Sequence, residues 1–260
     1  MRWLPCALLL LAPAVLAHPG VDTRIARIDQ AIQQTPEDWQ LYLKRSVLHI
    51  QAGHLEKAAA DLETAEALGA GTRAAFHRGQ LAQAKGDFPA AIEYFSQAPE
   101  SASTLLNRAR AYRQAGQLER ASLDYRRHLA LDERPQPGDV IAAVEVLDRL
   151  EGPQAAERLL SRHLHSPNAQ LQRLHIDLLL RSQQTDAALE AGRALGQTLD
   201  HSPSWRLFMA ELFLKTGHVP DAMAYANGAL AGVAKQKQTP ARQQLRQRIE
   251  RFIADLASPM

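Results

Sequence analysis

Residues 75–98 read AFHRGQLAQAKGDFPAAIEYFSQA, and this pattern of glycine and alanine decides the fold. The same pattern recurs in LYLKRSVLHIQAGHLEKAAADLETA (residues 41–65) and in LLNRARAYRQAGQLERASLDYRR (residues 105–127). Each copy has a central glycine, a small residue seven positions earlier and an alanine five positions later. A fourth copy surrounds GHVPDA. The repeated positions are Gly53, Gly86, Gly116 and Gly217, then Ala58, Ala91, Ala121 and Ala222, with Gly79 as a small residue before the turn.

These spacings predict pairs of antiparallel helices joined at the glycine. Glycine adopts the backbone angles of a tight turn without steric cost. The small residues before and after the turn let the two helices approach closely. Bulky residues two and nine positions after the glycine fill the space beside them, since separations of 3, 4 and 7 share one helical face.

The repeated unit resembles the tetratricopeptide repeat family, whose unit is a helix–turn–helix of about 34 residues. The resemblance implies an all-α fold, a right-handed α-solenoid of antiparallel helix pairs. Two further turns are degenerate: Gly152 is followed by Ala156, one residue early, and Gln183 replaces the glycine ahead of Ala188. The six turn positions are then 53, 86, 116, 152, 183 and 217, and every spacing lies near the family's period.

The predicted organisation is a single array with caps at both ends. Residues 132–139, DERPQPGD, are its predicted weak boundary, because two prolines and a glycine interrupt it. Thr239 and Pro240 predict the start of the last helix. The predicted segments are a signal peptide (1–17), an N-terminal capping helix (18–36), three well-matched units (37–133), two divergent units (134–201), a sixth unit (202–237) and a C-terminal capping helix (238–260).

The composition supports helices and excludes several classes of function. The 260 residues include 45 Ala and 38 Leu but only 8 Val and 9 Ile, and aromatic residues make up 5%. Strands favour β-branched and aromatic side chains, so a sheet-rich fold is not expected. The formal net charge of +2 indicates no strongly basic nucleic-acid binder, and we expect no nucleic-acid partner.

Residues 1–17, MRWLPCALLLLAPAVLA, have the features of a secretory signal peptide: one Arg, an apolar run and small residues before a cut between Ala17 and His18. The apolar run is too short to cross a bilayer, so no membrane span is expected after cleavage. Cleavage would remove Cys6, the single cysteine, and with it any disulfide or thiolate metal site. We therefore expect a periplasmic or secreted protein.

Motifs for catalysis are missing from the sequence. It has no phosphate-binding glycine loop and no G-x-S-x-G motif, and no cofactor is predicted. Acidic residues such as Glu119 and Asp124 fall on helix faces that the register predicts to be solvated. His163 and His165 are two residues apart and so do not share a helix face. These observations favour a non-enzymatic protein. One alternative is metal handling through His18, which cleavage would leave at the N-terminus.

In the family that the chain resembles, the first helix of each pair lines a concave groove that holds a partner segment. The groove positions of the first three units carry four permanent positive charges and no acidic residue. This excess predicts a partner with carboxylates. The family's carboxylate-clamp subtype is not expected, because Leu43, Val47 and Gln80 stand where it needs Lys or Asn. Leu43, Val47 and Ile50 are expected to contact either a partner's hydrophobic side chain or the preceding N-terminal helix. The predicted partner-binding residues are Lys44, Arg73, Phe76, His77, Gln80, Asn107, Arg110 and Arg113.

The sequence therefore predicts a non-catalytic scaffold for protein–protein interaction in a bacterial envelope, with another protein or a peptide as partner. A second alternative is an accessory subunit of an envelope assembly or polymer-export machine, where similar repeat proteins occur. The sequence leaves the oligomeric state open.

Overall fold

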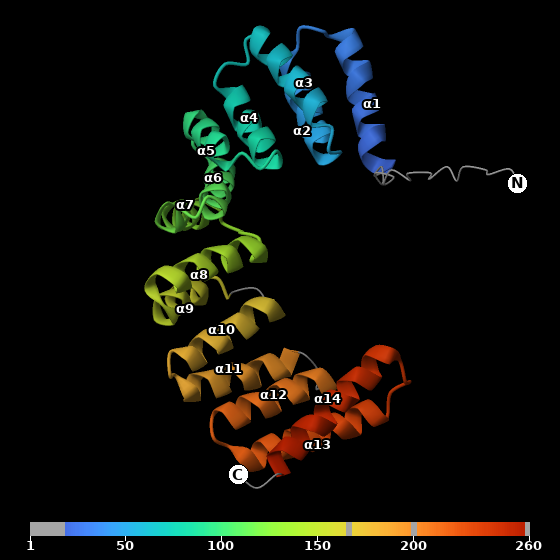
Figure 1. Cartoon of the computed structure of the whole chain (residues 1–260), viewed down its shortest axis with the longest axis vertical. Helices are drawn as coiled ribbons and strands as arrows, with labels where there is room; N and C mark the ends of the chain where they lie inside the picture. Colours follow the sequence, from blue (N-terminus) through green and yellow to red (C-terminus); the bar gives the residue numbers. More distant parts are fainter. Residues whose placement is uncertain (1–18, 165–167, 199–201, 258–260) are drawn as a thin grey trace, which may run out of the picture. The chain divides into compact units, whose positions relative to one another are not determined.

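The structure is a computed structural model that describes residues 19–164, 168–198 and 202–257. The predicted signal peptide, His18 and His165 lie outside the described residues. Throughout these three ranges the regular elements are α-helices, and no strand occurs among them (Figure 1). The chain divides into two compact units between Leu131 and Asp132, at the edge of the Pro-containing segment that was predicted to be a weak boundary. The chain therefore forms two compact units where one continuous array was predicted.

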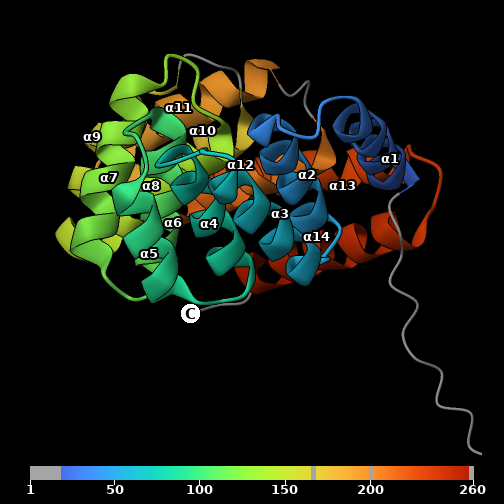
Figure 2. The same ribbon diagram turned by 90° about the horizontal axis from the view of Figure 1, so that it is seen from above.

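The first unit contains one single helix followed by three helix pairs. Helix α1 packs on α2, and α1, α2 and α3 lie side by side in two perpendicular views (Figures 1 and 2). The pairs are α2–α3, α4–α5 and α6–α7, and each pair also contacts the next one along the chain. The helices are α1 (Pro19–Gln34), α2 (Trp39–Gln51), α3 (Leu55–Ala67), α4 (Arg73–Ala84), α5 (Phe88–Gln97), α6 (Ala102–Gln114) and α7 (Leu118–Leu131).

The second unit repeats the arrangement and ends in a single helix, α14. The pairs are α8–α9, α10–α11 and α12–α13. Pro240 begins α14 as predicted, and the Thr239 hydroxyl accepts a hydrogen bond from the backbone N–H of Arg242 at 3.3 Å. The helices are α8 (Pro137–Glu151), α9 (Pro153–Ser161), α10 (Ala169–Arg181), α11 (Thr185–Thr198), α12 (Pro203–Lys215), α13 (Val219–Ala234) and α14 (Pro240–Ala257). No helix in the described ranges has the length and apolar character needed to cross a membrane.

All six predicted turn positions have a positive φ angle. Gly53, Gly86, Gly116 and Gly217 have φ between +74° and +80°, and Gly152 has +86°. The sixth position is Gln183 at +62°, the single non-glycine residue with positive φ in the described chain. Left-handed backbone disfavours residues with a Cβ atom, so the turn geometry is retained at residue 183 against the local preference of glutamine.

The alanines after the turns form the contact between paired helices. Ala58, Ala91, Ala121 and Ala222 are each 0% exposed. Gly79, before the second turn, faces the ring of Phe95, and a Cβ atom added at residue 79 would lie only 2.5 Å from that ring. The helices of this pair therefore meet with no room for a further methyl group.

One prediction about charged residues was wrong. Asp124 was expected on a solvated face, but it is 2% exposed. Arg108 donates hydrogen bonds to both carboxylate oxygens of Asp124, at 2.6 and 2.9 Å. Arg45 and Asp61 form the equivalent pair two repeats earlier, with the same separation of 16 residues. Ion pairing satisfies a carboxylate that the register had placed at the surface, and so allows its burial.

Candidate partner-binding pocket

A pocket of about 710 Å³ opens in the first unit, between α1 and the first helices of two repeats. Helix α1 forms one wall, α2 forms the base and α4 supplies the other wall. Its volume is within the ordinary range of ligand sites in proteins. The residues that line it are Arg24, Arg27 and Ile28 from α1, Trp39, Gln40, Leu43, Lys44, Val47 and Leu48 from α2, and Arg73 and His77 from α4.

The base of the pocket follows from the helical spacing of α2. Leu43 and Val47 are four residues apart and so lie on one face of the helix. Leu43 is only 5% exposed and belongs to the hydrophobic core between α2, α3 and α4. Lys44 is exposed at the edge of that apolar floor. Leu43 was predicted to contact either a partner's hydrophobic side chain or the preceding N-terminal helix; it is a largely buried part of the floor, beside the α1 residues that line the same pocket.

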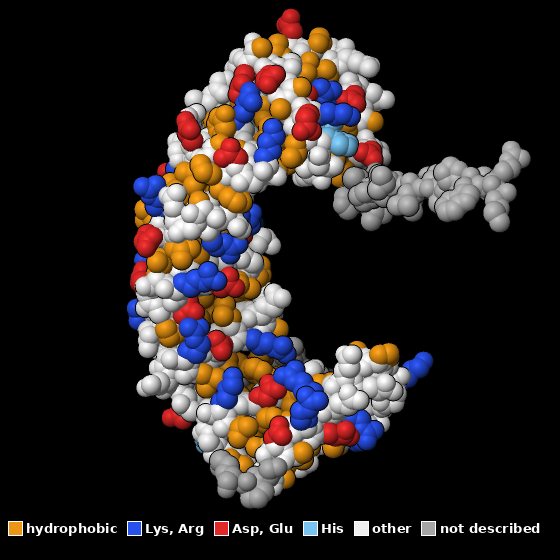
Figure 3. All heavy atoms as spheres, in the orientation of Figure 1, with side chains coloured by type: hydrophobic (Ala, Val, Ile, Leu, Met, Phe, Trp, Pro, Cys, Tyr) orange, Lys and Arg blue, Asp and Glu red, His pale blue; other side chains and the backbone are white. Residues whose placement is uncertain are grey.

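Positive charge surrounds this floor. Arg24, Arg27, Lys44 and Arg73 line the pocket, and no acidic residue does. Within the part of the chain that the structure describes, none of these four side chains has a carboxylate partner. The Arg73 guanidinium lies 5.5 Å from the centre of the Trp39 ring, close enough for a cation–π contact. On the face drawn in Figure 3, by contrast, acidic and basic side chains are interspersed.

His77 adds no full charge to the pocket near neutral pH. Burial lowers the pKa of His77 below its usual 6.5, and a hydrogen bond with Gln80 opposes this effect only in part. The ring Nδ1 atom and the Gln80 side-chain oxygen are 3.2 Å apart. The permanent charge of the site therefore comes from the three arginines and the lysine.

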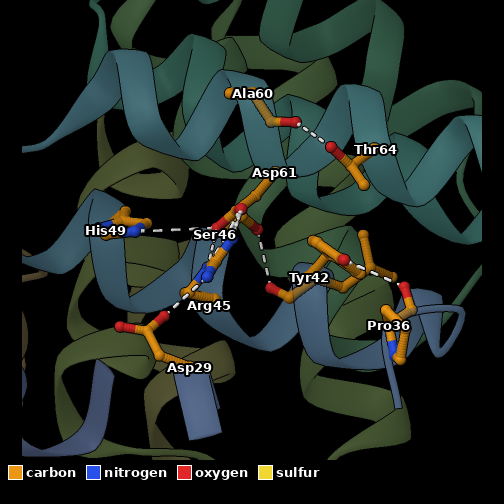
Figure 4. A network of polar contacts seen from close by, with 10 residues as sticks. Asp29, Pro36, Tyr42, Arg45, Ser46, His49, Ala60, Asp61 and Thr64 are labelled. Carbon is orange, nitrogen blue, oxygen red and sulfur yellow. Dashed lines mark hydrogen bonds and ion pairs between the residues drawn. The ribbon is translucent and has the colours of Figure 1, made fainter. Parts of the chain in front are cut away.

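A network of charged groups holds α1 against α2 and α3 (Figure 4). Arg45 of α2 donates to Asp29 of α1 at 2.7 Å and to Asp61 of α3 at 2.6 Å. The hydrogen bond with Asp61 contributes most to raising the pKa of Arg45 above its ordinary value, and the hydrogen bond with Asp29 adds to it. Burial acts in the opposite direction. Burial lowers the pKa of His49, whose Nε2 atom lies 3.8 Å from Asp61. Arg45 thus fixes the helix that carries Arg24 and Arg27.

The structure brings together some of the predicted partner-binding residues and separates others. Lys44, Arg73 and His77 share the pocket, whereas Phe76 is half-buried, with its ring 5.7 Å from that of Phe95. Gln80 contacts His77 rather than lining the pocket.

The predicted positions in α6 do not join this site. The Asn107 side chain donates to the backbone oxygen of Ser103 in its own helix, at 2.8 Å. Arg110 and Arg113 are half-buried and already have interaction partners within the chain. Asn107, Arg110 and Arg113 lie outside the pocket, so their predicted role in partner binding stays a prediction, and the candidate pocket lies nearer the N-terminus.

Sequence reasoning missed the contribution of α1. Arg24, Arg27 and Ile28 lie three and four residues apart, which places them on one helix face. The spacing was visible in the sequence, but the helix was interpreted only as a cap.

The sequence profile of the tetratricopeptide repeat family matches residues 43–104 and 73–140. The chain contains tetratricopeptide repeats. This fold supports a role as a scaffold for protein–protein interaction, with another protein or a peptide as partner, and proteins of the family are in general non-catalytic interaction modules.

Several solved structures have a similar arrangement of helices. PilF from Pseudomonas aeruginosa is 14% identical, with a TM-score of 0.54 over 82% of this chain and 97% of that one. MamA is 19% identical, with a TM-score of 0.52 over 66% and 100%. A chain of the Cut9–Hcn1 hetero-tetramer of the APC/C is 14% identical, with a TM-score of 0.51 over 90% of this chain. The match covers only 46% of the Cut9–Hcn1 chain, so the chain described here spans less than half of that chain's length. At these identities the likeness shows the fold alone. No curated protein sequence matches the chain.

Proposed function

We propose that this protein is a non-catalytic scaffold of the bacterial envelope, and that it holds a partner's segment on the first-helix faces of α2 and α4. The observation that supports the proposal is the pocket, where Lys44 and Arg73 stand over an apolar floor without a carboxylate partner in the described chain. Unpaired charges at the rim of an apolar depression favour a ligand that offers both carboxylates and aliphatic carbon.

The location in the envelope rests on the sequence of residues 1–17, with export to the periplasm or beyond and cleavage before His18. Mass spectrometry of the exported protein should give an N-terminus at His18. Recovery of the chain with residues 1–17 intact would remove the support for a periplasmic or secreted protein.

The binding role is tested by capture with variants of the mature chain. Lys44→Ala combined with Arg73→Ala should lower recovery of the principal envelope partner, once that partner has been identified and its bound segment mapped. A matched control is Lys57→Ala combined with Lys85→Ala, which removes two exposed charges of the same unit outside the pocket. Equal recovery with both double variants would place the binding surface elsewhere.

The same preparation tests the two alternatives predicted from the sequence. A metal-handling protein would bind a divalent metal such as Cu²⁺ or Zn²⁺ tightly through His18, so a titration of the mature chain that shows no tight binding removes this alternative. No group of three or more candidate ligands that could hold a metal ion occurs among the described residues. Identification of the captured partner as a component of an envelope assembly or polymer-export machine would favour the accessory-subunit alternative.

A further inference from the structure

Helix α1 is the part of the pocket that lies outside the matched repeats. The family profile begins at residue 43, whereas α1 ends at Gln34. A helix that only capped the array would be expected to turn charged side chains to solvent and to cover apolar surface. Arg24 and Arg27 are exposed, but they do not lie apart from the pocket, because they line it together with Ile28 of the same helix.

Positive charge lies on both walls of the pocket and at the edge of its base. Arg24 and Arg27 belong to one wall and Arg73 to the opposite one, with Lys44 at the edge of the base. Four cations gathered without a carboxylate partner raise the free energy of the unbound protein by mutual repulsion, and an anionic ligand relieves it. The apolar floor between the walls favours aliphatic carbon over a simple inorganic anion.

The volume sets the length of segment that the pocket can hold. A helix about 10–12 Å wide that rises 1.5 Å per residue occupies about 120–170 Å³ per residue. The pocket of about 710 Å³ therefore has room for about four to six residues. A segment with an aliphatic side chain at its centre and carboxylates on both sides would match the apolar floor and the positively charged walls.

We infer that α1 is a wall of the binding site, and that the occupant is a short acidic segment of a partner protein, with an aliphatic residue between Asp or Glu residues. This inference rests on the proposed function and adds to it the contribution of α1 and the chemistry of the segment. Asp29 does not line the pocket; it positions α1 through its 2.7 Å contact with Arg45.

The test uses the mature chain and a fluorescently labelled peptide, Glu-Asp-Leu-Asp-Glu, with an amidated C-terminus so that only side-chain carboxylates are offered. The matched probe is Gln-Asn-Leu-Asn-Gln. Fluorescence anisotropy should show binding of the acidic peptide, weaker binding of the neutral one, and a loss of affinity as salt rises from 0.05 to 0.5 M, because salt screens exposed charges. Unlabelled glutarate, which carries carboxylates on a short chain, should compete only weakly.

Two double variants separate this inference from the proposed function. Arg24→Gln with Arg27→Gln should weaken peptide binding about 2- to 25-fold, since an exposed ion pair contributes a factor of about 1.4–5. Lys44→Gln with Arg73→Gln should weaken it by a similar factor. Lys57→Gln with Lys85→Gln, outside the pocket, should leave it within twofold. Circular dichroism should show the same helicity for all three.

Each outcome decides between the two proposals. Loss of binding in the α2–α4 variant but not in the α1 variant would overturn the role of α1 and leave the proposed function standing. Equal binding of the neutral peptide would overturn the acidic chemistry of the occupant. Competition by glutarate as strong as that of the unlabelled acidic peptide would indicate a small-molecule anion site instead. Failure of every folded variant to change peptide binding would overturn both proposals.

Discussion

Removal of the Asp124 charge should destabilise the first unit although the substitution is nearly isosteric. Arg108 donates to both carboxylate oxygens of Asp124, at 2.6 and 2.9 Å. In Asp124→Asn the amide oxygen still accepts one of these hydrogen bonds, but the amide NH2 cannot accept the other and the negative charge beside Arg108 is lost. Breaking a buried pair by removing one partner costs about 3–5 kcal/mol. The Arg108 side chain is 19% exposed and so keeps some access to water. We therefore expect a loss of about 2–3 kcal/mol in the free energy of unfolding.

The matched control is Glu100→Gln, which neutralises a carboxylate of equal hydrogen-bond length in the same unit. Glu100 accepts from Arg127 at 2.6 Å, but the two side chains are 54% and 43% exposed. Exposed pairs contribute about 0–1 kcal/mol, so this variant should be almost as stable as the original protein.

The assay is urea unfolding followed by circular dichroism, with hydrogen exchange of the α6 and α7 amides to assign the change to the first unit. The assignment is needed because a chain of two compact units need not unfold in one step. Equal stability of the Asp124→Asn and Glu100→Gln proteins would refute the argument that burial of the Arg108–Asp124 pair makes it costly to break.

Four further variants or conditions test the repeat register, the turn geometry, the position of α1 and the buried histidines. Ala91→Glu should cost several kcal/mol in thermal melting, because residue 91 is fully buried, whereas Ala84→Glu at an exposed position should cost far less; equally mild effects would contradict the register. Gln183→Gly should stabilise the second unit by about 0.5–1 kcal/mol in urea unfolding, because it relieves a left-handed residue at some cost in chain entropy; destabilisation would contradict this account of the turn. Asp29→Asn should speed hydrogen exchange in α1 more than in α4, and unchanged exchange in α1 would show that the contact with Arg45 does not hold the helix. His49 and His77 have folded-state pKa values below 6.5, so as the pH falls the unfolded chain takes up protons before the folded chain does. The free energy of unfolding of the first unit should therefore be full above pH 6.5 and fall as the pH drops below it. This loss of stability in acid should be smaller in the double variant His49→Gln, His77→Gln.

The helix pairs could be predicted because the same two physical requirements recur at a fixed spacing. A close contact between helices needs a small residue, and a tight turn needs a residue that adopts left-handed backbone angles. Gly86 and Ala91 meet both requirements within six residues. The turn at Gln183 was predictable only from the period, because its own side chain argues against the conformation that it adopts.

The candidate site was harder to predict because one of its walls comes from α1, which lies outside the repeat pattern that relates α2 and α4. Lys44 and Arg73 were found from the register of the first helices, whereas Arg24 and Arg27 fall outside it. Asp124 shows a second limit: helical periodicity gives the direction of a side chain, but its burial depends on Arg108, 16 residues away. Arg110 and Arg113 illustrate the same limit, since a sequence does not show which arginines already have partners.

The fully buried alanines have a consequence for how such a protein can acquire new specificity. Residues such as Ala58 and Ala91 fix the spacing of the helices, and they are not the residues that line the pocket. Lys44 and Arg73 project from the same scaffold without contributing to that spacing. Substitutions at these outer positions can therefore redesign recognition while the architecture stays constant, which makes the pocket a practical place to graft affinity for a chosen peptide.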